Sequence, residues 1–328
     1  MGTHTSTYTN PTHPNKHSTA ACVALLDERR DLRAAIADMA IFRHALTPEL
    51  MQGLLLPSPP DSTVKLAVAD GNLGPEALSA LARACFAARV PLLFEPTSTA
   101  KAALPVKAHA LGRVAILKPN LKELAQLAWV LQGRHGHGVR PEEEEGRLER
   151  LFEEAEEAAV DSKGLLDAAT VVSLVRPALE LVLRAMRGGS ADAADARAQA
   201  AGWAGGWAGQ KHVLVTLGVH GLVWGRGPEC GEGEVEATFF PARLVAEMAD
   251  CTGAGDTLVA AVVGALVAEE GCGMEAAIRL GMAAARRSVK VLEAIPPDLS
   301  FAALARDVET ASASVPAPAQ RGGEATRR

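Results

Sequence analysis

The sequence predicts an α/β fold in which a mostly parallel sheet carries helices on both faces. Short apolar runs alternate with helical stretches between residues 64 and 131, as in strand–helix–strand units. Each run ends in a polar cluster, and in such folds ligands collect at the carboxyl ends of the strands. A chain of 328 residues, 48% of them hydrophobic, can bury the core that such a sheet needs.

The first part of the chain supplies a hairpin and three strand–helix units. Residues 20–26 and 32–37 are apolar and flank a charged turn, which favours a β-hairpin, although alanine and leucine also permit helix there. The following elements are expected as strands over 64–69, 90–94 and 113–117, with helices over 75–88 and 121–131.

The second part begins with a change of composition. Residues 133–163 and 190–210 are predicted to be low-complexity surface excursions around a helix over 165–187, and the acidic runs there are interpreted as solvated helix faces. The core then resumes with strands over 212–218, 221–225 and 235–240 and helices over 254–269 and 274–291. Residues 1–18 and 312–328 are predicted to be a disordered leader and tail, so the predicted domain spans 19–311.

Bulk properties exclude several classes of protein. A net charge of -6 argues against nucleic acid or an anionic membrane as the main partner. Five cysteines without Cys-x-x-Cys spacing argue against a disulfide framework or a zinc site, and favour a reducing compartment, hence the cytoplasm. No apolar run reaches the length of about 18 residues that a membrane span needs. The first six residues fit a loose myristoylation pattern, against the simpler interpretation of a disordered leader.

The stretch that best predicts chemistry is residues 250–256, Asp-Cys-Thr-Gly-Ala-Gly-Asp, directly before a long apolar helix. Glycines let main-chain amides approach an anion, and a helix start adds free N–H donors and a favourable dipole. Such a place suits a phosphate group whose charge spreads during transfer. Asp256 lies at the helix start and could take the proton from an attacking hydroxyl. The alternative is that Asp256 is a helix cap and that the glycines form a plain turn.

Two further groups follow expected strands. Asn120 opens a helix with Glu123 at capping-box spacing, so both residues serve either as a helix cap or at a magnesium–phosphate site. Thr216, Gly218 and Gly221 lie in a strand and turn that could line a nucleotide pocket, or could form a tight turn alone.

Taken together and in this order, these motifs resemble the PfkB (ribokinase-like) carbohydrate kinase family. The resemblance implies a three-layer ribokinase-like fold with a β-hairpin lid, and it covers roughly residues 18–130 and 211–305. It implies an ATP- and Mg²⁺-dependent phosphotransferase in which Asp256 is the catalytic base. The other implied roles are an anion hole at Gly253, Ala254 and Gly255, ATP contacts at Asn120, Thr216, Gly218 and Gly221, and a metal contact through water at Glu123.

Several segments look most like the pseudouridine kinase branch, among them residues 70–73 and 94–101. This implies transfer to the 5′-hydroxyl of pseudouridine. The alternatives are another small-molecule acceptor, such as ribose, adenosine or fructose, and a non-catalytic protein that binds nucleotide. Members of this branch are often fused to a pseudouridine-5′-phosphate glycosidase, and a homodimer is one assembly that the sequence allows.

The chain departs from the family pattern at two places. Cys251 stands where the family usually has threonine. The opening strand with a substrate-binding Asp, and the Gly-Gly-x-x-x-Asn segment after it, are not found, so the first third of the fold is expected to be missing. Because positioning of the acceptor supplies about 7–11 kcal/mol in favourable cases, this chain alone is expected to be nearly inactive.

Overall fold

In the computed structural model, residues 19–26, 32–54, 64–133, 150, 167–188, 210–227, 233–268, 272–293 and 295–313 are described. The predicted leader lies outside them, as do nearly all of the two predicted excursions and the tail beyond residue 313. The chain divides into two compact units, Met1–Leu244 and Val245–Arg328. Among the described residues, no helix is both long and apolar enough to cross a membrane.

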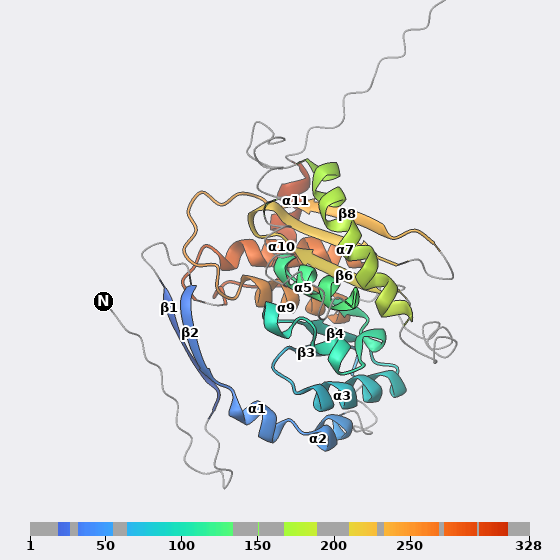
Figure 1. Cartoon of the computed structure of the whole chain (residues 1–328). Helices are drawn as coiled ribbons and strands as arrows, with labels where there is room; N and C mark the ends of the chain where they lie inside the picture. Colours follow the sequence, from blue (N-terminus) through green and yellow to red (C-terminus); the bar gives the residue numbers. More distant parts are fainter. Residues whose placement is uncertain are drawn as a thin grey trace, which may run out of the picture. The chain divides into compact units, whose positions relative to one another are not determined.

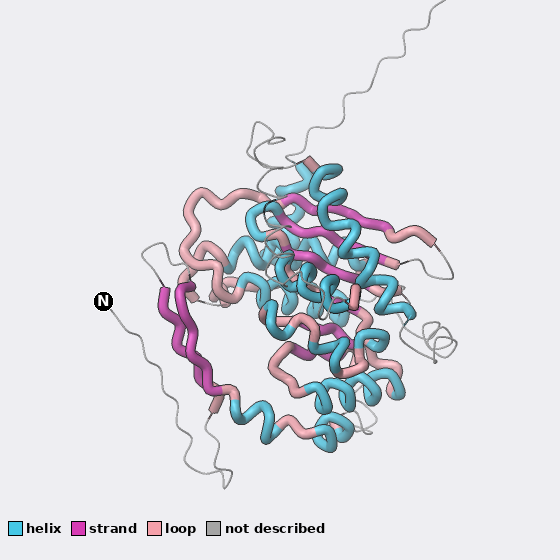
Figure 2. Tube along the Cα trace, in the orientation of Figure 1, coloured by secondary structure: helices cyan, strands magenta, loops and turns pink. Residues whose placement is uncertain are grey.

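The predicted hairpin is present and forms a two-stranded sheet of its own (Figure 1, Figure 2). Strands β1 (Ala21–Leu26) and β2 (Leu32–Asp38) pair antiparallel, with Val23 opposite Ile36. The alternative helical interpretation of this segment is therefore wrong.

A six-stranded sheet in the order β3-β4-β5-β6-β7-β8 organises the first unit. The first four strands run parallel, whereas β7 and β8 are added antiparallel. The strands are β3 (Ala67–Asp70), β4 (Leu92–Glu95), β5 (Ile116–Leu117), β6 (His212–Thr216), β7 (Gly221–Arg226) and β8 (Glu236–Pro241). The mostly parallel α/β sheet predicted from the sequence is confirmed.

Successive residues along β4 and β6 are buried, so both faces of the sheet are covered there. One apolar core joins the sheet to α3, α5 and α7. Besides the strands, the first unit contains α1 (Ala40–Ala45), α2 (Pro48–Gly53), α3 (Pro75–Ala87), α4 (Leu104–Lys107), α5 (Leu121–Leu131) and α7 (Ala168–Gly188), and the 3₁₀ turns η1 (Thr99–Lys101), η2 (Leu111–Arg113) and η3 (Gly218–His220).

Strands β3, β4, β5 and β6 are all shorter than predicted, and for β3 and β5 the structure shows the reason. Ala67 donates to the carbonyl of Pro91, and Pro91 has no N–H to continue the pairing, so residues 64–66 are not strand. Residues 111–113 wind into η2, which leaves β5 only two residues long. Helices α1, α2 and α4 were not predicted, because they are short and their apolar periodicity is weak. The helix over Phe301–Ala313 was not predicted either.

The second unit is helical and consists of α9 (Ala254–Ala268), α10 (Met274–Ser288) and α11 (Phe301–Ala313). Helices α9 and α10 approach closely, since a Cβ on Gly281 would lie 2.6 Å from Val262 Cγ2 and 3.0 Å from the carbonyl oxygen of Leu258. Ala261 and Ala284 belong to one buried cluster of this unit, and their small side chains suit such a close approach.

Candidate active site

The carboxyl ends of the four parallel strands bring polar residues from distant parts of the sequence to one edge. Asp70 ends β3, Glu95 ends β4, and Thr216 ends β6, while Lys118 and Asn120 follow β5. Asn120 forms a parallel bridge with Thr216, and the amide of Thr216 donates to the carbonyl of Pro119 at 3.0 Å. The structure therefore places Asn120 and Thr216, both predicted to contact ATP, side by side.

Asn120 and Glu123 form a complete capping box at the start of α5. The Glu123 amide donates to Asn120 Oδ1 at 2.9 Å, and the Asn120 amide donates to Glu123 Oε2 at 2.8 Å. Asn120 is exposed, whereas Glu123 is only 2% exposed. The capping function is thus real, and it holds the buried carboxylate of Glu123 in one orientation.

Burial dominates the electrostatics of Glu123. Loss of solvent raises its pKa above the ordinary value, the Asn120 amide opposes that rise, Glu95 adds to it, and Lys118 opposes it. Two charged neighbours therefore act on this carboxylate with opposite signs.

These neighbours form an ion pair that the sequence analysis missed. Lys118 Nζ donates to Glu95 Oε1 at 2.7 Å, and the two side chains are only 6% and 12% exposed. The Lys118 amide also donates to the carbonyl of Phe94 at 3.1 Å, so the main chains of this edge are joined as well. The sequence could have indicated this pair, because Glu95 and Lys118 carry opposite charges and each directly follows a short apolar run that was predicted to be a strand.

A second network at the same edge was also missed. Lys101 Nζ donates to Asn72 Oδ1 at 2.6 Å, and the Asn72 side chain donates to Asp70 Oδ2 at 2.7 Å. Thr97, which follows β4, has φ of 63°, an uncommon conformation for a β-branched residue. Both segments lie in stretches that resemble the pseudouridine kinase branch, but no role was predicted for these residues.

The turn after β6 depends on two glycines with positive φ. The Leu217 amide donates to the carbonyl of Gly221 at 2.8 Å and closes the turn. Gly218 has φ of 58°, is exposed, and has open space where a Cβ would be. Gly221 has φ of 121° and is buried, and its Cβ would lie 2.1 Å from the Phe240 carbonyl oxygen. A side chain at Gly221 therefore conflicts with β8.

The residues that start α9 belong to the second unit. Gly253 has φ of 80°, and its carbonyl accepts from the Thr257 amide at 2.8 Å. The turn itself is anchored by Asp250, whose Oδ1 accepts from both the amide and the hydroxyl of Thr252 at 2.9 Å. Asp250, and not Asp256, is thus the acid that holds this turn together.

Asp256 lies in the first turn of α9 with its side chain exposed. No hydrogen bond or ion pair of its carboxylate is found within the described residues. Likewise, within the described main chain, the amides of Gly255 and Asp256 have no main-chain acceptor. The second unit therefore presents unpaired donors and an exposed carboxylate at one helix start.

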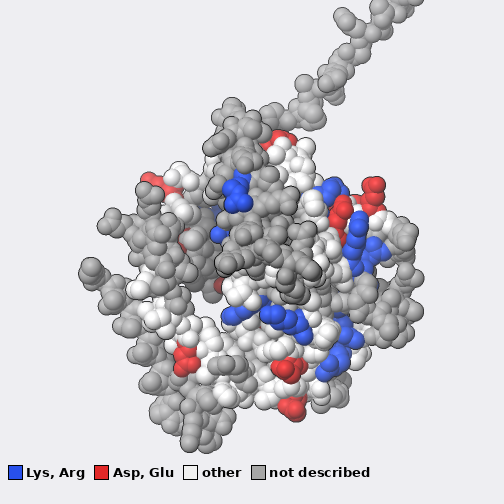
Figure 3. All heavy atoms as spheres, in the orientation of Figure 1, with Lys and Arg blue, Asp and Glu red and all other residues white. Residues whose placement is uncertain are grey.

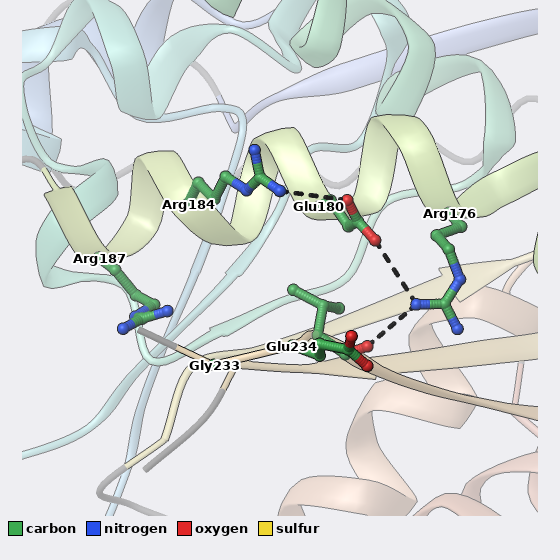
Figure 4. Close-up of a pocket in the computed structure, with 7 residues that line it drawn as sticks. Arg176, Glu180, Arg184, Arg187, Gly233 and Glu234 are labelled. Carbon is green, nitrogen blue, oxygen red and sulfur yellow. Dashed lines mark hydrogen bonds and ion pairs between the residues drawn. The ribbon is translucent and has the colours of Figure 1, made fainter. Parts of the chain in front are cut away.

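A pocket of about 620 Å³ occurs elsewhere in the first unit, between α7 and the stretch before β8 (Figure 4). Arg176 Nη1 donates to the Val235 carbonyl at 3.1 Å, and Glu180 lies 3.5 Å from Arg176 and 3.4 Å from Arg184. Figure 3 shows acidic and basic side chains next to one another in the area of α7 and β8. The pocket is lined by Arg176, Glu180, Arg184, Arg187, Gly233, Glu234 and Val235, and none of them is a predicted site residue.

Comparisons with known proteins agree on the fold. Residues 162–300 match the model of the pfkB family of carbohydrate kinases. The pseudouridine kinase of Arabidopsis thaliana is 25% identical over 298 residues, which cover 89% of this chain and 73% of that protein. The carbohydrate kinase from Agrobacterium tumefaciens superposes with a TM-score of 0.51 at 20% identity, over 90% of this chain and 70% of that one. Arabidopsis thaliana ribokinase, complexed with ribose and ATP, gives 0.50 at 17% identity over the same shares.

Proposed function

We propose that this chain is a kinase of the pfkB family, whose model matches residues 162–300, and that it transfers the γ-phosphate of ATP to a hydroxyl of a sugar or nucleoside. One observation carries the proposal: an exposed, unpaired Asp256 follows a glycine turn at the start of α9, where main-chain amides lack acceptors within the described residues. This combination provides a proton acceptor next to donors for a phosphate group.

The proposed reaction divides the work between the residues. Asp256 accepts the proton of the acceptor hydroxyl while the oxygen of that hydroxyl bonds to the γ-phosphorus. The bond from the γ-phosphorus to the β-phosphate oxygen breaks at the same time, and ADP is released. The amides of Gly253 and Gly255, which have no main-chain acceptor within the described residues, stabilise the negative charge on the phosphoryl oxygens. The predicted contribution of Ala254 is less direct, because its amide donates to the carbonyl of Cys251 at 3.3 Å. The nucleotide is bound by the predicted contacts, which are Asn120, Thr216, Gly218 and Gly221.

The residues of the first unit fit a magnesium ion held through water. Mg²⁺ keeps several waters and takes few direct carboxylates, and Glu123 is a single buried carboxylate with one oxygen bound to the Asn120 amide. When bound, the ion would neutralise charge on the phosphates. Glu123 and Asn120 would orient it, and the capping box keeps both rigid.

Pseudouridine is the acceptor that we propose first, at its 5′-hydroxyl, because the relative that matches 89% of this chain is a pseudouridine kinase. At 25% identity that likeness also leaves ribose, adenosine or fructose open, and the superposition on a ribokinase complexed with ribose and ATP favours testing ribose next. A protein that binds nucleotide without transferring phosphate is the remaining alternative.

The test is coupled ADP release by the whole chain with a panel of nucleosides and sugars. In any form of the protein that turns over, Asp256→Asn should lower kcat by about 10²–10⁴-fold while largely sparing ATP affinity. Glu275→Gln is the matched control, because it removes a carboxylate from the first turn of the neighbouring helix α10. Retained turnover in Asp256→Asn refutes the assignment of the base. ATP binding without turnover for every acceptor favours the non-catalytic alternative.

A further inference from the structure

The pocket between α7 and the stretch before β8 lies at the opposite end of the sheet from the predicted nucleotide contacts, and we call it the amino-end pocket. Its volume is about 620 Å³, a size that suits a small molecule, and three arginines and a glutamate of α7 line it together with residues 233–235. Glu236, the next residue, pairs with Arg226, which pairs with His212 at the start of β6. Thr216, a predicted ATP contact, stands at the other end of β6. A ligand in the amino-end pocket would therefore leave the predicted nucleotide site unoccupied.

Two arginines of the amino-end pocket are only loosely paired with the glutamate between them. Arg176 Nη1 donates to the Val235 carbonyl at 3.1 Å, and Figure 4 shows Glu180 between Arg176 and Arg184. Glu180 lies 3.5 Å from Arg176 and 3.4 Å from Arg184, whereas charge-assisted hydrogen bonds are normally about 2.7–2.9 Å long. In helix α10, Arg279 lies 2.8 Å from a glutamate at the same spacing of four positions. Arg176 and Arg184 therefore retain donors for an anion that fits them better than Glu180 does.

Helix α7 holds the positions of these arginines fixed. Its apolar face is buried in the core, where Val175, Leu179 and Val182 are not exposed to solvent at all. A Cβ on Gly225 would lie 2.5 Å from Leu179 Cδ1, so the helix packs directly on β7. The main chain on both sides of the amino-end pocket thus belongs to one packed unit, as a preformed binding site requires.

A structural role explains part of this arrangement but not all of it. Cations in the last turns of a helix interact favourably with the helix dipole, and opposite charges four positions apart stabilise a helix. Neither effect requires a cavity, and neither requires the bond from Arg176 to the main chain before β8. A binding role accounts for both.

The chemistry of the lining indicates the class of ligand. The guanidinium groups of Arg176, Arg184 and Arg187 only donate, and their planar forks match the oxygens of a phosphate group. The carboxylates of Glu180 and Glu234 only accept, which suits hydroxyl groups. Formally the three arginines and two glutamates give the lining a net charge of plus one. A ligand that carries a phosphate group and several hydroxyls complements both kinds of side chain.

We propose that the amino-end pocket binds a sugar phosphate, with the phosphate on Arg176 and Arg184 and the hydroxyls on the carboxylates of Glu180 and Glu234. The site is separate from the one that the proposed function uses, since it shares no residue with the predicted contacts of ATP, magnesium or the acceptor. The two can therefore be tested independently.

The contacts of Glu180 give opposite predictions for substitutions on the same helix. Arg176→Gln and Arg184→Gln each remove a donor, so a sugar phosphate should bind more weakly. Glu180→Gln removes the negative charge that competes for both arginines, so inorganic phosphate should bind more tightly. The same substitution removes an acceptor for hydroxyls, so the preference for a sugar phosphate over inorganic phosphate should fall. Charged pairs that only stabilise the helix would produce no such difference.

The experiment measures binding to the whole chain by calorimetry. The probes are ribose 5-phosphate, glucose 6-phosphate and fructose 6-phosphate, each compared with inorganic phosphate and with the sugar that lacks the phosphate. At least one sugar phosphate should bind more tightly than both of its parts. Arg176→Gln and Arg184→Gln should each weaken that binding by about tenfold or more, because a hydrogen bond to a charged group is typically worth this much. Arg279→Gln, which removes an arginine from an exposed pair of α10, is the matched control and should bind as the native chain does.

Each outcome decides the inference. If none of the three sugar phosphates binds, or if both arginine variants bind them as the native chain does, the amino-end pocket is not their site and the inference is overturned. If inorganic phosphate binds as tightly as every sugar phosphate, the assignment of the hydroxyls is refuted and the inference is likewise overturned. Circular dichroism reports whether each variant is folded. If an arginine variant is not folded, Arg184→Lys decides, because it keeps the charge of the helix but loses the fork, and should still weaken binding.

Discussion

Gly221→Ala should destabilise the sheet strongly, and the structure gives the size of the effect. Gly221 has φ of 121°, a conformation that side chains rarely adopt, and this alone costs on the order of 1–3 kcal/mol. The new Cβ would also lie 2.1 Å from the Phe240 oxygen and 2.6 Å from the Ala242 nitrogen, both main-chain atoms of β8 or the residue after it. Overpacking of this kind typically costs about 1–3 kcal/mol more. The sum, about 2–6 kcal/mol, is a large part of a typical folding free energy.

Gly218→Ala is the matched control, because Gly218 lies in the same turn with φ of 58° and open space around its missing Cβ. That substitution should cost only about 1–2 kcal/mol. Urea unfolding followed by circular dichroism measures both changes, and hydrogen exchange of peptides from β7 and β8 shows where the loss occurs. Equal losses in the two variants, or unchanged exchange in β7 and β8, would refute the argument that the turn is sterically locked at Gly221.

Three further predictions concern stability. Asn120→Ala should lower stability by about 0.5–2 kcal/mol in urea unfolding, because it removes the side chain that caps α5. Gly281→Ala should lower the melting temperature more than Gly273→Ala, because a Cβ meets Val262 at the first site and nothing within 4 Å at the second. Burial lowers the pKa of Lys211 from 10.5 to about 8, so between these values the folded chain binds fewer protons than the unfolded chain, and the contribution of Lys211 to stability rises with pH. The loss caused by Lys211→Met should therefore be larger at about pH 9.5 than at pH 7.

The sequence predicted the elements whose pattern is local. Helix α5 begins and ends at the predicted residues, since Asn120 and Glu123 signal its start and its apolar positions repeat at helical spacing. Likewise, the hairpin and the order of the strands followed from apolar runs and turn residues. The ends of β3 and β5 were not predictable, because they depend on which neighbouring residue can continue the ladder, as Pro91 cannot.

The sequence motifs predicted only some of the residues that lie close together at the candidate site. The bridge between Asn120 and Thr216 joins segments that are 96 positions apart in the chain. Both residues were predicted to contact ATP. The ion pair of Lys118 with Glu95 was missed because a charged residue at a strand end is normally expected to be exposed to solvent. Its burial depends on how the neighbouring strands and α5 enclose it, which no local pattern encodes.

The two parts of the candidate machinery rely on opposite electrostatic environments. Asp256 is exposed, so its carboxylate is free to meet a substrate. Glu123 is already buried and oriented by the Asn120 amide, and its burial raises its pKa above the ordinary value before any ligand arrives. Substitutions around Glu123 should therefore act mainly on binding of magnesium nucleotide, whereas substitution of Asp256 should act mainly on kcat. A substitution of Glu123 that lowered kcat at saturating nucleotide and magnesium, with unchanged binding, would contradict this division.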